Sequence, residues 1–220
     1  MQRLIRPVPA GNACDGNHSC ERLRLDAIGT NAEIPMIDHE RRAIFIHQRK
    51  VAGMSIMTAL GFSPKNPNWH RFNDGVLSAD WRDRNQLERG YFVFSAVRNP
   101  FGRLISSWKY LKATRDRALI DVLLDPPREG HDYRHLTRPQ VVILRDETNG
   151  ALIVHDLIRF ESVQVDFDRI CDRIGAPRRL LPHLNATVGA SSYRKYFDQD
   201  TRRLTEEMFA DDLAAFAYDF

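Results

Sequence analysis

Short apolar runs alternate along this chain with stretches in which apolar residues recur every three or four positions. Two apolar runs, residues 43–47 and 91–97, have the length and composition of buried parallel strands. Helical spacing follows each run, with apolar positions at 56, 57 and 60 after the first and at 101, 104, 105, 108 and 111 after the second. Residues 152–160 predict one or two further strands.

Three more helices are predicted in the second half of the chain. They cover residues 118–124, the stripe 163–174 that ends before Gly175 and Pro177, and one last amphipathic helix over 198–216. Residues 125–139 are predicted to be a long loop because Pro126, Pro127 and Gly130 interrupt the pattern. Alternating strands and helices indicate an α/β fold whose central parallel sheet is flanked by helices.

Residues 1–40 are polar, and prolines and glycines break any periodicity. We expect an irregular N-terminal extension over 1–40 and a single domain over 41–220. In open parallel sheets, ligands bind beyond the carboxyl ends of the strands, so the segments after residues 47 and 97 are the first places to search for chemistry.

Composition narrows the class of protein. The 220 residues are 43% hydrophobic and 28% charged, as in ordinary globular domains, which excludes disordered, collagen-like and coiled-coil chains. The longest apolar run, 91–97, is far shorter than the roughly 18–20 residues of a membrane helix. Neither a membrane span nor a secretory signal is recognised, which predicts a soluble, cytoplasmic protein. Three cysteines make no disulfide framework, and no metal site is predicted.

The charge balance argues against one class of partner. A net charge of +3 is weak for a nucleic-acid-binding domain, so no nucleic-acid partner is expected. The 32 basic residues comprise 27 Arg and only 5 Lys. Arginine binds planar oxyanions through a two-pronged fork, whereas lysine offers a mobile point charge. Most of the arginine excess carries no functional information.

The segment after the first strand has the features of an anion cradle. Lys50 precedes Gly53 by three residues, and Ser55 stands at the start of the next helix. Gly53 lets the backbone approach an oxyanion closely, and the free N–H groups of 53–56 would point at it. The phosphate loop G-x-x-x-x-G-K-[ST] and the fingerprint G-x-G-x-x-G are both absent. An ordinary strand–turn–helix connection explains this segment equally well.

The segment after the second strand carries a second candidate. Arg98 ends the strand, and Ser106 follows in the early turns of the next helix. A guanidinium fork and a hydroxyl in this arrangement can converge on one phosphate. Arg103 is either a further anion ligand or a structural anchor, and we favour the anchor.

Together the two segments resemble those of the carbohydrate-type sulfotransferases, which are similar to sulfotransferase family 2. The family shares a K-[TS]-A-G-[TS]-[ST] loop and an R-[DN]-P-x-x-R-x-x-S segment, here residues 50–55 and 98–106. Further likenesses cover about residues 42–220, at Arg138-Pro139-Gln140, Ile158-Arg159-Phe160-Glu161, Leu181-Pro182-His183-Leu184-Asn185 and the D-x-x-x-F-x-Y ending with Asp211-Asp212-Leu213 and Phe216-Ala217-Tyr218. The resemblance implies a P-loop-NTPase-like three-layer fold.

The resemblance also implies a donor, 3′-phosphoadenosine-5′-phosphosulfate (PAPS), whose spent product is 3′-phosphoadenosine-5′-phosphate (PAP). Carried over by position, the 5′ side would meet Lys50, Gly53, Met54, Ser55 and Ile56. The 3′-phosphate would be held by Arg98 and Ser106. Arg49 stands where the family has Pro, and Met54 where it has a Thr hydroxyl, so one charge-assisted hydrogen bond is missing.

A late basic and aromatic segment is a further candidate for donor binding. Related enzymes often close such a segment over the nucleotide, which would assign Tyr193, Arg194 and Lys195 to the donor site. The alternative is a solvated loop before the last helix.

Sulfuryl transfer makes the same demands as phosphoryl transfer, namely positioning, charge stabilisation and removal of the acceptor proton. Lys50 suits stabilisation of the leaving phosphate. The family implies a histidine base before the second strand, here His70, with Asp74 and Asp80 as alternatives. His47 either orients Lys50 or is a packed neutral side chain.

The interpretation is therefore a PAPS-dependent sulfotransferase that acts on a hydroxyl of a carbohydrate or glycoconjugate. Lacking the N-terminal anchor of eukaryotic relatives, it is expected to be a soluble bacterial enzyme. His135 and Arg138 are expected near an acidic acceptor. The alternatives are a non-catalytic polyanion-binding module on the same fold and a P-loop-like kinase of a small molecule. The sequence indicates no oligomeric state.

Overall fold

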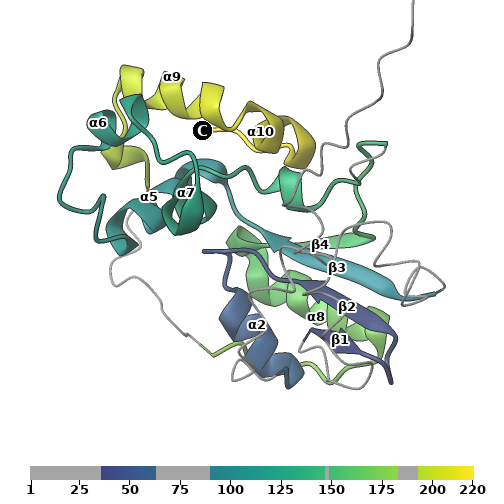
Figure 1. The fold of residues 1–220 in the computed structure, drawn as a ribbon. Helices are drawn as coiled ribbons and strands as arrows, with labels where there is room; N and C mark the ends of the chain where they lie inside the picture. Colours follow the sequence, from purple (N-terminus) through teal and green to yellow (C-terminus); the bar gives the residue numbers. More distant parts are fainter. Residues whose placement is uncertain (1–35, 63–89, 147–148, 183–192) are drawn as a thin grey trace, which may run out of the picture. The chain divides into compact units, whose positions relative to one another are not determined.

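The computed structural model describes residues 36–62, 90–146, 149–182 and 193–220. In these ranges a four-stranded sheet runs in the order β1 (Ile37–Asp38), β2 (Ala43–Ile46), β3 (Phe92–Val97) and β4 (Asp156–Arg159) (Figure 1). The pairs β2–β3 and β3–β4 are parallel, and β1 pairs antiparallel with β2. The predicted α/β class is confirmed, and the sheet is mostly rather than wholly parallel.

The register places the apolar residues of adjacent strands side by side. Phe45 of β2 pairs with Phe94 of β3, and Ser95 of β3 pairs with Leu157 of β4. The Ser95 hydroxyl donates to the Ile46 carbonyl at 2.7 Å, so the one polar side chain buried between these strands is satisfied. Parallel register brings the carboxyl ends of β2, β3 and β4 to the same edge.

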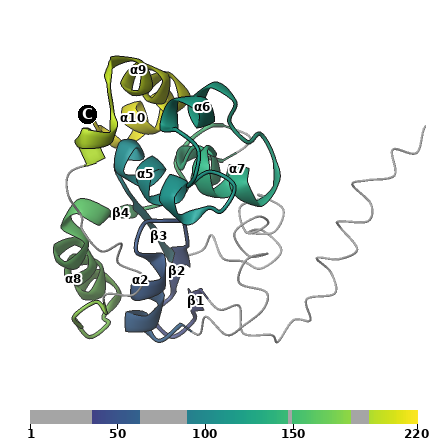
Figure 2. The same ribbon diagram turned by 90° about the vertical axis from the view of Figure 1, so that its left-hand side faces the viewer.

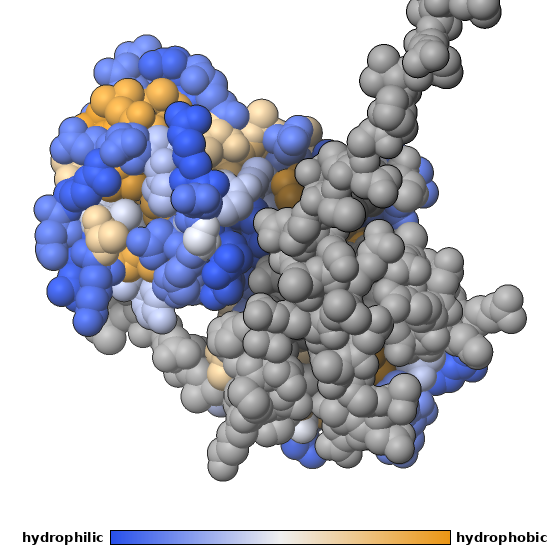
Figure 3. Space-filling view, viewed as in Figure 1, coloured by the Kyte–Doolittle hydropathy of each residue, from blue (hydrophilic) through white to orange (hydrophobic). Residues whose placement is uncertain are grey.

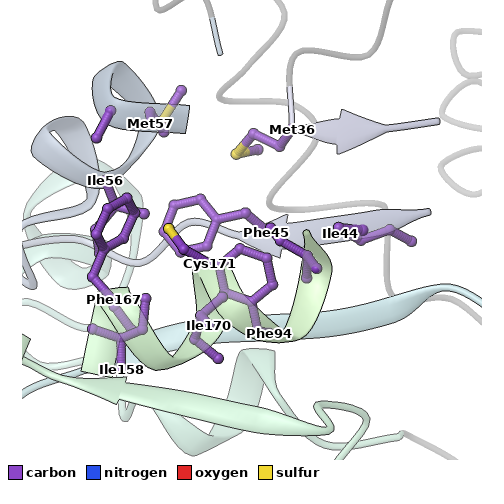
Figure 4. Close-up of a cluster of buried hydrophobic side chains, with 14 of the residues drawn as sticks. Met36, Ile44, Phe45, Ile56, Met57, Phe94, Ile158, Phe167, Ile170 and Cys171 are labelled. Atoms are coloured by element: carbon purple, nitrogen blue, oxygen red, sulfur yellow. The ribbon is translucent and has the colours of Figure 1, made fainter. Parts of the chain in front are cut away.

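The first face of the sheet carries the larger apolar core. It packs against α2 (Gly53–Leu60) and α8 (Val163–Ile174), whose apolar stripes were visible in the sequence. Figure 4 shows Phe45 and Phe94 of the sheet meeting Phe167 and Ile170 of α8. Burying side chains of this size contributes about 1.5–3 kcal/mol each, which fixes both helices on the sheet.

The opposite face has a smaller core. It packs against the short 3₁₀ helix η1 (Val141–Ile143) and α10 (Ala210–Phe216). Val97 of β3 contributes to this core with Val141 and Phe216. Alternate side chains of β3 therefore enter different cores, as the period of two in a strand requires. The sheet is flanked by helices on both faces.

A third cluster forms beyond the carboxyl end of β3. It joins α5 (Pro100–Tyr110), α6 (Leu119–Leu124), α7 (Gly130–Leu136) and α9 (Gln199–Met208). Leu104, Val122 and Leu136 are buried there with Phe209, which lies between α9 and α10. Figure 2 shows this helical group beside the end of the sheet. Two further 3₁₀ turns complete the elements, η2 (Phe160–Ser162) and η3 (Tyr193–Tyr196).

Three predicted boundaries differ from the structure. β1 lies within the range 1–40 that was expected to be irregular, and two paired residues are too few to leave a periodic signal. α7 lies within the predicted loop 125–139, where Gly130 begins the helix at φ 72° instead of breaking one. The predicted last helix is two helices, because Phe209 leaves helical geometry at φ −116°, ψ 25° while its ring stays buried.

Within the described ranges, no helix combines the length and the apolar character that crossing a bilayer requires. On the face shown in Figure 3, mainly hydrophilic side chains cover the helical group, with smaller apolar areas among them.

Candidate functional site

The connection from β2 to α2 is a strained turn that opens a helix N-terminus. Two non-glycine residues, Lys50 and Ala52, adopt left-handed backbone angles with φ of 67° and 65°. Ala52 is the N-cap of α2, and no side chain caps the helix. The first N–H groups of a helix lack intrahelical acceptors and lie at its positive end. This end of α2 can therefore offer the backbone N–H groups of Gly53, Met54 and Ser55 to an oxyanion, whereas the Ile56 N–H, which was also expected to be free, donates to the Ala52 carbonyl at 3.1 Å.

Gly53 has a second reason to be glycine, which the sequence did not reveal. A Cβ at this position would collide with the ring of His47, and it would also lie 3.3 Å from the Gln48 carbonyl oxygen. His47 is buried and makes an edge contact with Phe45 at 6.2 Å between ring centroids. Of the two interpretations of His47, the structure favours the packed side chain. Because Gly53 has no side chain, the His47 ring can pack directly against the loop.

Lys50 lies against an aromatic ring. Its Nζ is 4.1 Å from the centroid of the Tyr110 ring, a distance typical of a cation–π contact. Burial, followed by the nearby Arg98 charge, lowers the pKa of Lys50 below its ordinary value. Tyr110 is the last residue of α5, so the cation–π contact joins the first strand end to the helix that starts at the second.

Arg49 and His135 make a second link between the loop and the helical group. Arg49 Nη1 lies 2.7 Å from His135 Nε2, and since arginine only donates, Nε2 accepts and the proton of the neutral ring is on Nδ1. His135 stacks on Tyr110 at 5.4 Å between centroids. Burial and the positive charges of Arg49 and its neighbours lower the pKa of His135 to about 3, so the ring is neutral.

The second strand end is held by side chains of other segments. The Gln140 amide accepts from the Arg98 backbone N–H and donates to the Arg98 carbonyl, both at 2.9 Å. Gln140 is in turn held by the buried carboxylate of Asp212, which accepts from its backbone and side-chain N–H groups and from Val141 N–H. The backbone of Arg98 is thus fixed by a completed hydrogen-bond network.

The Arg98 guanidinium faces the first strand end. It lies over the Phe160 ring at 3.9 Å, and its Nη1 donates to the Lys50 carbonyl at 3.3 Å. Burial lowers the pKa of Arg98 to about 10, partly offset by the negative charge of Glu161, so the fork stays protonated at neutral pH. The predicted 5′ loop and 3′ fork are therefore in direct contact.

One stripe of α5 connects the two ends. Gly102, Ser106 and Tyr110 are four residues apart and share a helix face. A Cβ on Gly102 would lie 3.3 Å from Arg98 Nε and 3.4 Å from Tyr193 Cδ1, so both side chains pack on the bare glycine. Ser106 is buried in the middle, and Tyr110 contacts Lys50 at the far end. The stripe runs from the fork to the loop.

The structure places the late basic segment at the fork through its tyrosine. Tyr193 stacks on Phe101 with ring centroids 6.1 Å apart, and its side chain borders Arg98 over Gly102. Arg194 Nη2 donates to the Phe220 carbonyl at 2.7 Å, and Lys195 Nζ lies 5.2 Å from the Tyr196 ring. Tyr193 is therefore beside the predicted 3′ site, while the contacts of Arg194 and Lys195 are with other residues.

Arg103 is an internal residue. It is buried, its Nη2 donates to the Arg138 carbonyl at 2.8 Å, and its guanidinium lies 5.2 Å from the Phe209 ring. Burial lowers the pKa of Arg103 to about 10, and the charge of Asp212 opposes that shift. These contacts favour the anchor over the anion ligand.

The predicted base His70 and its alternatives Asp74 and Asp80 lie outside the described residues. Several site residues were missed by the search for chemical motifs, namely Tyr110, Gln140 and Asp212. Gln140 and Asp212 had signals in the family resemblance, the Pro-Gln pair and the D-x-x-x-F-x-Y ending, but Gln140 lies 42 residues from Arg98 and 72 from Asp212. Tyr110 could have been found as the i+4 neighbour of Ser106. Among the described residues, no group of three or more His, Cys, Asp or Glu is placed to hold a metal ion.

Fold and site together define an α/β protein with two adjacent candidate oxyanion sites at the carboxyl edge of its sheet. A family model described as "Sulfotransferase family" matches residues 36–219, nearly the whole chain. The chain therefore belongs to the sulfotransferase family, whose members are transferases of sulfuryl groups. No curated protein and no solved structure matches the chain.

Proposed function

We propose that this protein transfers a sulfuryl group from PAPS to a hydroxyl of a carbohydrate or glycoconjugate. The observation that carries the proposal is the contact between the two strand ends, in which Arg98 donates to the Lys50 carbonyl across the α5 stripe. A donor with phosphate on both sides of its ribose needs two oxyanion sites at a fixed separation. An adenine nucleotide without the 3′-phosphate would leave the Arg98 fork empty.

The residues present fit this donor. The uncapped N-terminus of α2 and Lys50 would hold the 5′-phosphosulfate, and Arg98, Ser106 and Tyr193 would hold the 3′-phosphate. Met54 offers no hydroxyl, so the 5′ side depends on backbone N–H groups, the Ser55 hydroxyl and Lys50. PAPS supplies a sulfuryl group on a phosphate leaving group.

The chemistry asks three things of the chain. The acceptor oxygen must lie in line with the sulfur–oxygen bond that breaks, the acceptor proton must go to a base, and charge on the departing phosphate must be stabilised. Lys50 would supply the last of these, and its contact with Tyr110 orients it. We propose His70 as the base.

The donor is tested by calorimetric titration with PAP and with adenosine 5′-phosphate. We expect PAP to bind at least tenfold more tightly, and Arg98→Ala to abolish this preference, because one charge-assisted fork is lost. Arg203→Ala, an exposed arginine on α9, is the matched control and should change neither affinity. Equal affinity of the wild-type protein for the two nucleotides would overturn the proposal.

The acceptor is tested separately with labelled PAPS and a panel of hydroxyl-bearing glycans and small alcohols. Transfer to a glycan hydroxyl supports the proposal. Salt-sensitive binding of sulfated glycans without donor turnover would instead identify a polyanion-binding module, and magnesium-dependent transfer from ATP would identify a kinase.

A further inference from the structure

Asn99 stands between the Arg98 fork and Pro100, and every polar group it carries has a partner. Its backbone N–H donates to Glu161 Oε1 at 2.8 Å, and its carbonyl accepts from Arg103 N–H at 2.9 Å. Its side chain is buried. Capping a helix needs one acceptor only, so the amide of Asn99 has capacity for a second task.

The orientation of the Asn99 amide follows from its partners. Oδ1 accepts from the Phe101 backbone N–H at 3.0 Å, and because that group can only donate, the oxygen must face it. Nδ2 therefore faces the other way. It donates to the Asp219 carbonyl at 2.7 Å and to the Tyr193 hydroxyl oxygen at 3.2 Å.

The bond to Tyr193 determines what that hydroxyl can do. A phenol oxygen that accepts from an amide N–H directs its own proton elsewhere. The Tyr193 side chain packs with Arg98 on Gly102 and stacks on Phe101, so its ring has little freedom to turn. Its hydroxyl proton is thus available to an anion that the Arg98 fork would hold.

We propose that Asn99 is a positioning residue of the donor site, which orients the Tyr193 hydroxyl as a hydrogen-bond donor to the 3′-phosphate of the nucleotide. The inference rests on the proposed function. The Asn99 amide then has two tasks. Oδ1 caps α5, and Nδ2 orients the Tyr193 hydroxyl by donating a hydrogen bond to it. The same Nδ2 also donates to the Asp219 carbonyl, which ties the C-terminal segment to the residue after Arg98.

Asn99→Ser separates the two tasks. Serine is an equally good N-cap and carries no charge, but its short side chain cannot serve Phe101, Tyr193 and Asp219 together. Tyr193→Phe removes the hydroxyl and keeps the ring contacts. We expect each variant to bind PAP about tenfold more weakly, with unchanged affinity for adenosine 5′-phosphate, because one hydrogen bond to a charged group is lost.

The double variant provides the decisive measurement. If Asn99 acts through the Tyr193 hydroxyl, Asn99→Ser should have little further effect in the Tyr193→Phe background, so the two losses are not additive. Additive losses, or PAP binding by Asn99→Ser equal to the wild type, would overturn the inference. A purely capping role of Asn99 predicts that Asn99→Ser keeps the wild-type preference for PAP, whatever Tyr193→Phe does.

The outcomes remain distinguishable from a failure of the proposed function. A wild-type protein without preference for PAP would overturn both, whereas a wild type that prefers PAP and variants that keep this preference would overturn the inference alone. Should Asn99→Ser not fold, the test rests on Tyr193→Phe, which must still lose the preference for PAP. Circular dichroism establishes which variants are folded.

Discussion

The two strand ends are proposed to bind the same kind of group, and they are built in opposite ways. The first, residues 47–53, shapes its backbone by two left-handed non-glycine residues and leaves the α2 N-terminus without a side-chain cap. The second, residues 98–102, is held by side chains, since Gln140 and Glu161 bind the backbone of Arg98 and Asn99, and Asn99 caps α5. One end presents backbone donors, and the other presents a side-chain fork.

The difference has a physical reason. Backbone N–H groups can only receive an anion if nothing else occupies them, so the first end cannot be capped and depends on packing for its shape. A guanidinium fork projects from the backbone, so the backbone beneath it can be fully hydrogen-bonded without losing function. We therefore expect the first end to be sensitive to steric changes and the second to be sensitive to the loss of polar partners.

The largest expected effect concerns Lys50. Its side chain contacts the Tyr110 ring, and its backbone carbonyl accepts a hydrogen bond from Arg98. Lys50→Ala should lower the rate of sulfuryl transfer by about 10²–10³, the usual result of removing one charge-stabilising donor. Because burial lowers the pKa of Lys50 and only the protonated form stabilises the leaving phosphate, wild-type activity should decline at a lower pH than an exposed lysine would give.

Steady-state assays with labelled PAPS across alkaline pH measure both effects. Lys112→Ala, on the exposed segment after α5, is the control and should leave rate and profile unchanged. A Lys50→Ala variant within threefold of the wild-type rate would contradict the assigned role.

The second prediction tests the polar network of the second end. Asp212→Asn keeps the shape of a buried side chain but offers one acceptor oxygen to three N–H donors from Gln140 and Val141. The unsatisfied donors should lower the free energy of unfolding by about 2–3 kcal/mol. Urea denaturation measures this loss. The exposed neighbour Asp211→Asn should change stability by less than about 0.5 kcal/mol, and equal stability of both variants would show that the network is not needed.

The third prediction tests packing at the first end. Gly53→Ala drives a methyl group into the His47 ring and toward the Gln48 carbonyl, so unfolding should become easier by about 1–3 kcal/mol. His47→Ala in the same chain should recover part of the loss in urea denaturation. Thr58→Ala, exposed on α2, is the control. If Gly53→Ala is as stable as the wild type, the His47 contact does not shape the loop.

The last prediction concerns pH and His135, which links Arg49 to α7. The pKa of His135 is about 3 in the folded protein and about 6.5 in an unfolded chain. Between these values the unfolded chain binds a proton that the folded protein does not, so stability should fall as pH decreases from 6.5 toward 3. His135→Gln should flatten this dependence in thermal melts at stepped pH, whereas the exposed His39→Gln should leave it unchanged.

Prediction from the sequence succeeded where one local signal is strong. The strands at 43–46 and 92–97, the helices that follow them and the stripe of α8 were all recognised, because each has several apolar residues at a regular spacing. It failed where packing decides the local geometry. Phe209 continues the apolar spacing of a helix, yet its ring is buried between two helices and the backbone leaves helical geometry to place it there.

The same distinction applies to the candidate site. The sequence by itself determined the sulfotransferase family resemblance and the proposed donor-binding residues, Lys50 and Arg98 among them, since these lie in short motifs next to recognisable strands. Only the tertiary structure decided what holds them. Gln140 and Glu161 bind the backbone of Arg98 and Asn99, and Asp212 binds Gln140. The Tyr110 ring contacts the Lys50 ammonium group. These partners are tens of residues apart in the chain, and no periodicity or spacing relates them. Parallel pairing of β2, β3 and β4 brings the segments that carry Lys50, Arg98 and Glu161 to one edge of the sheet.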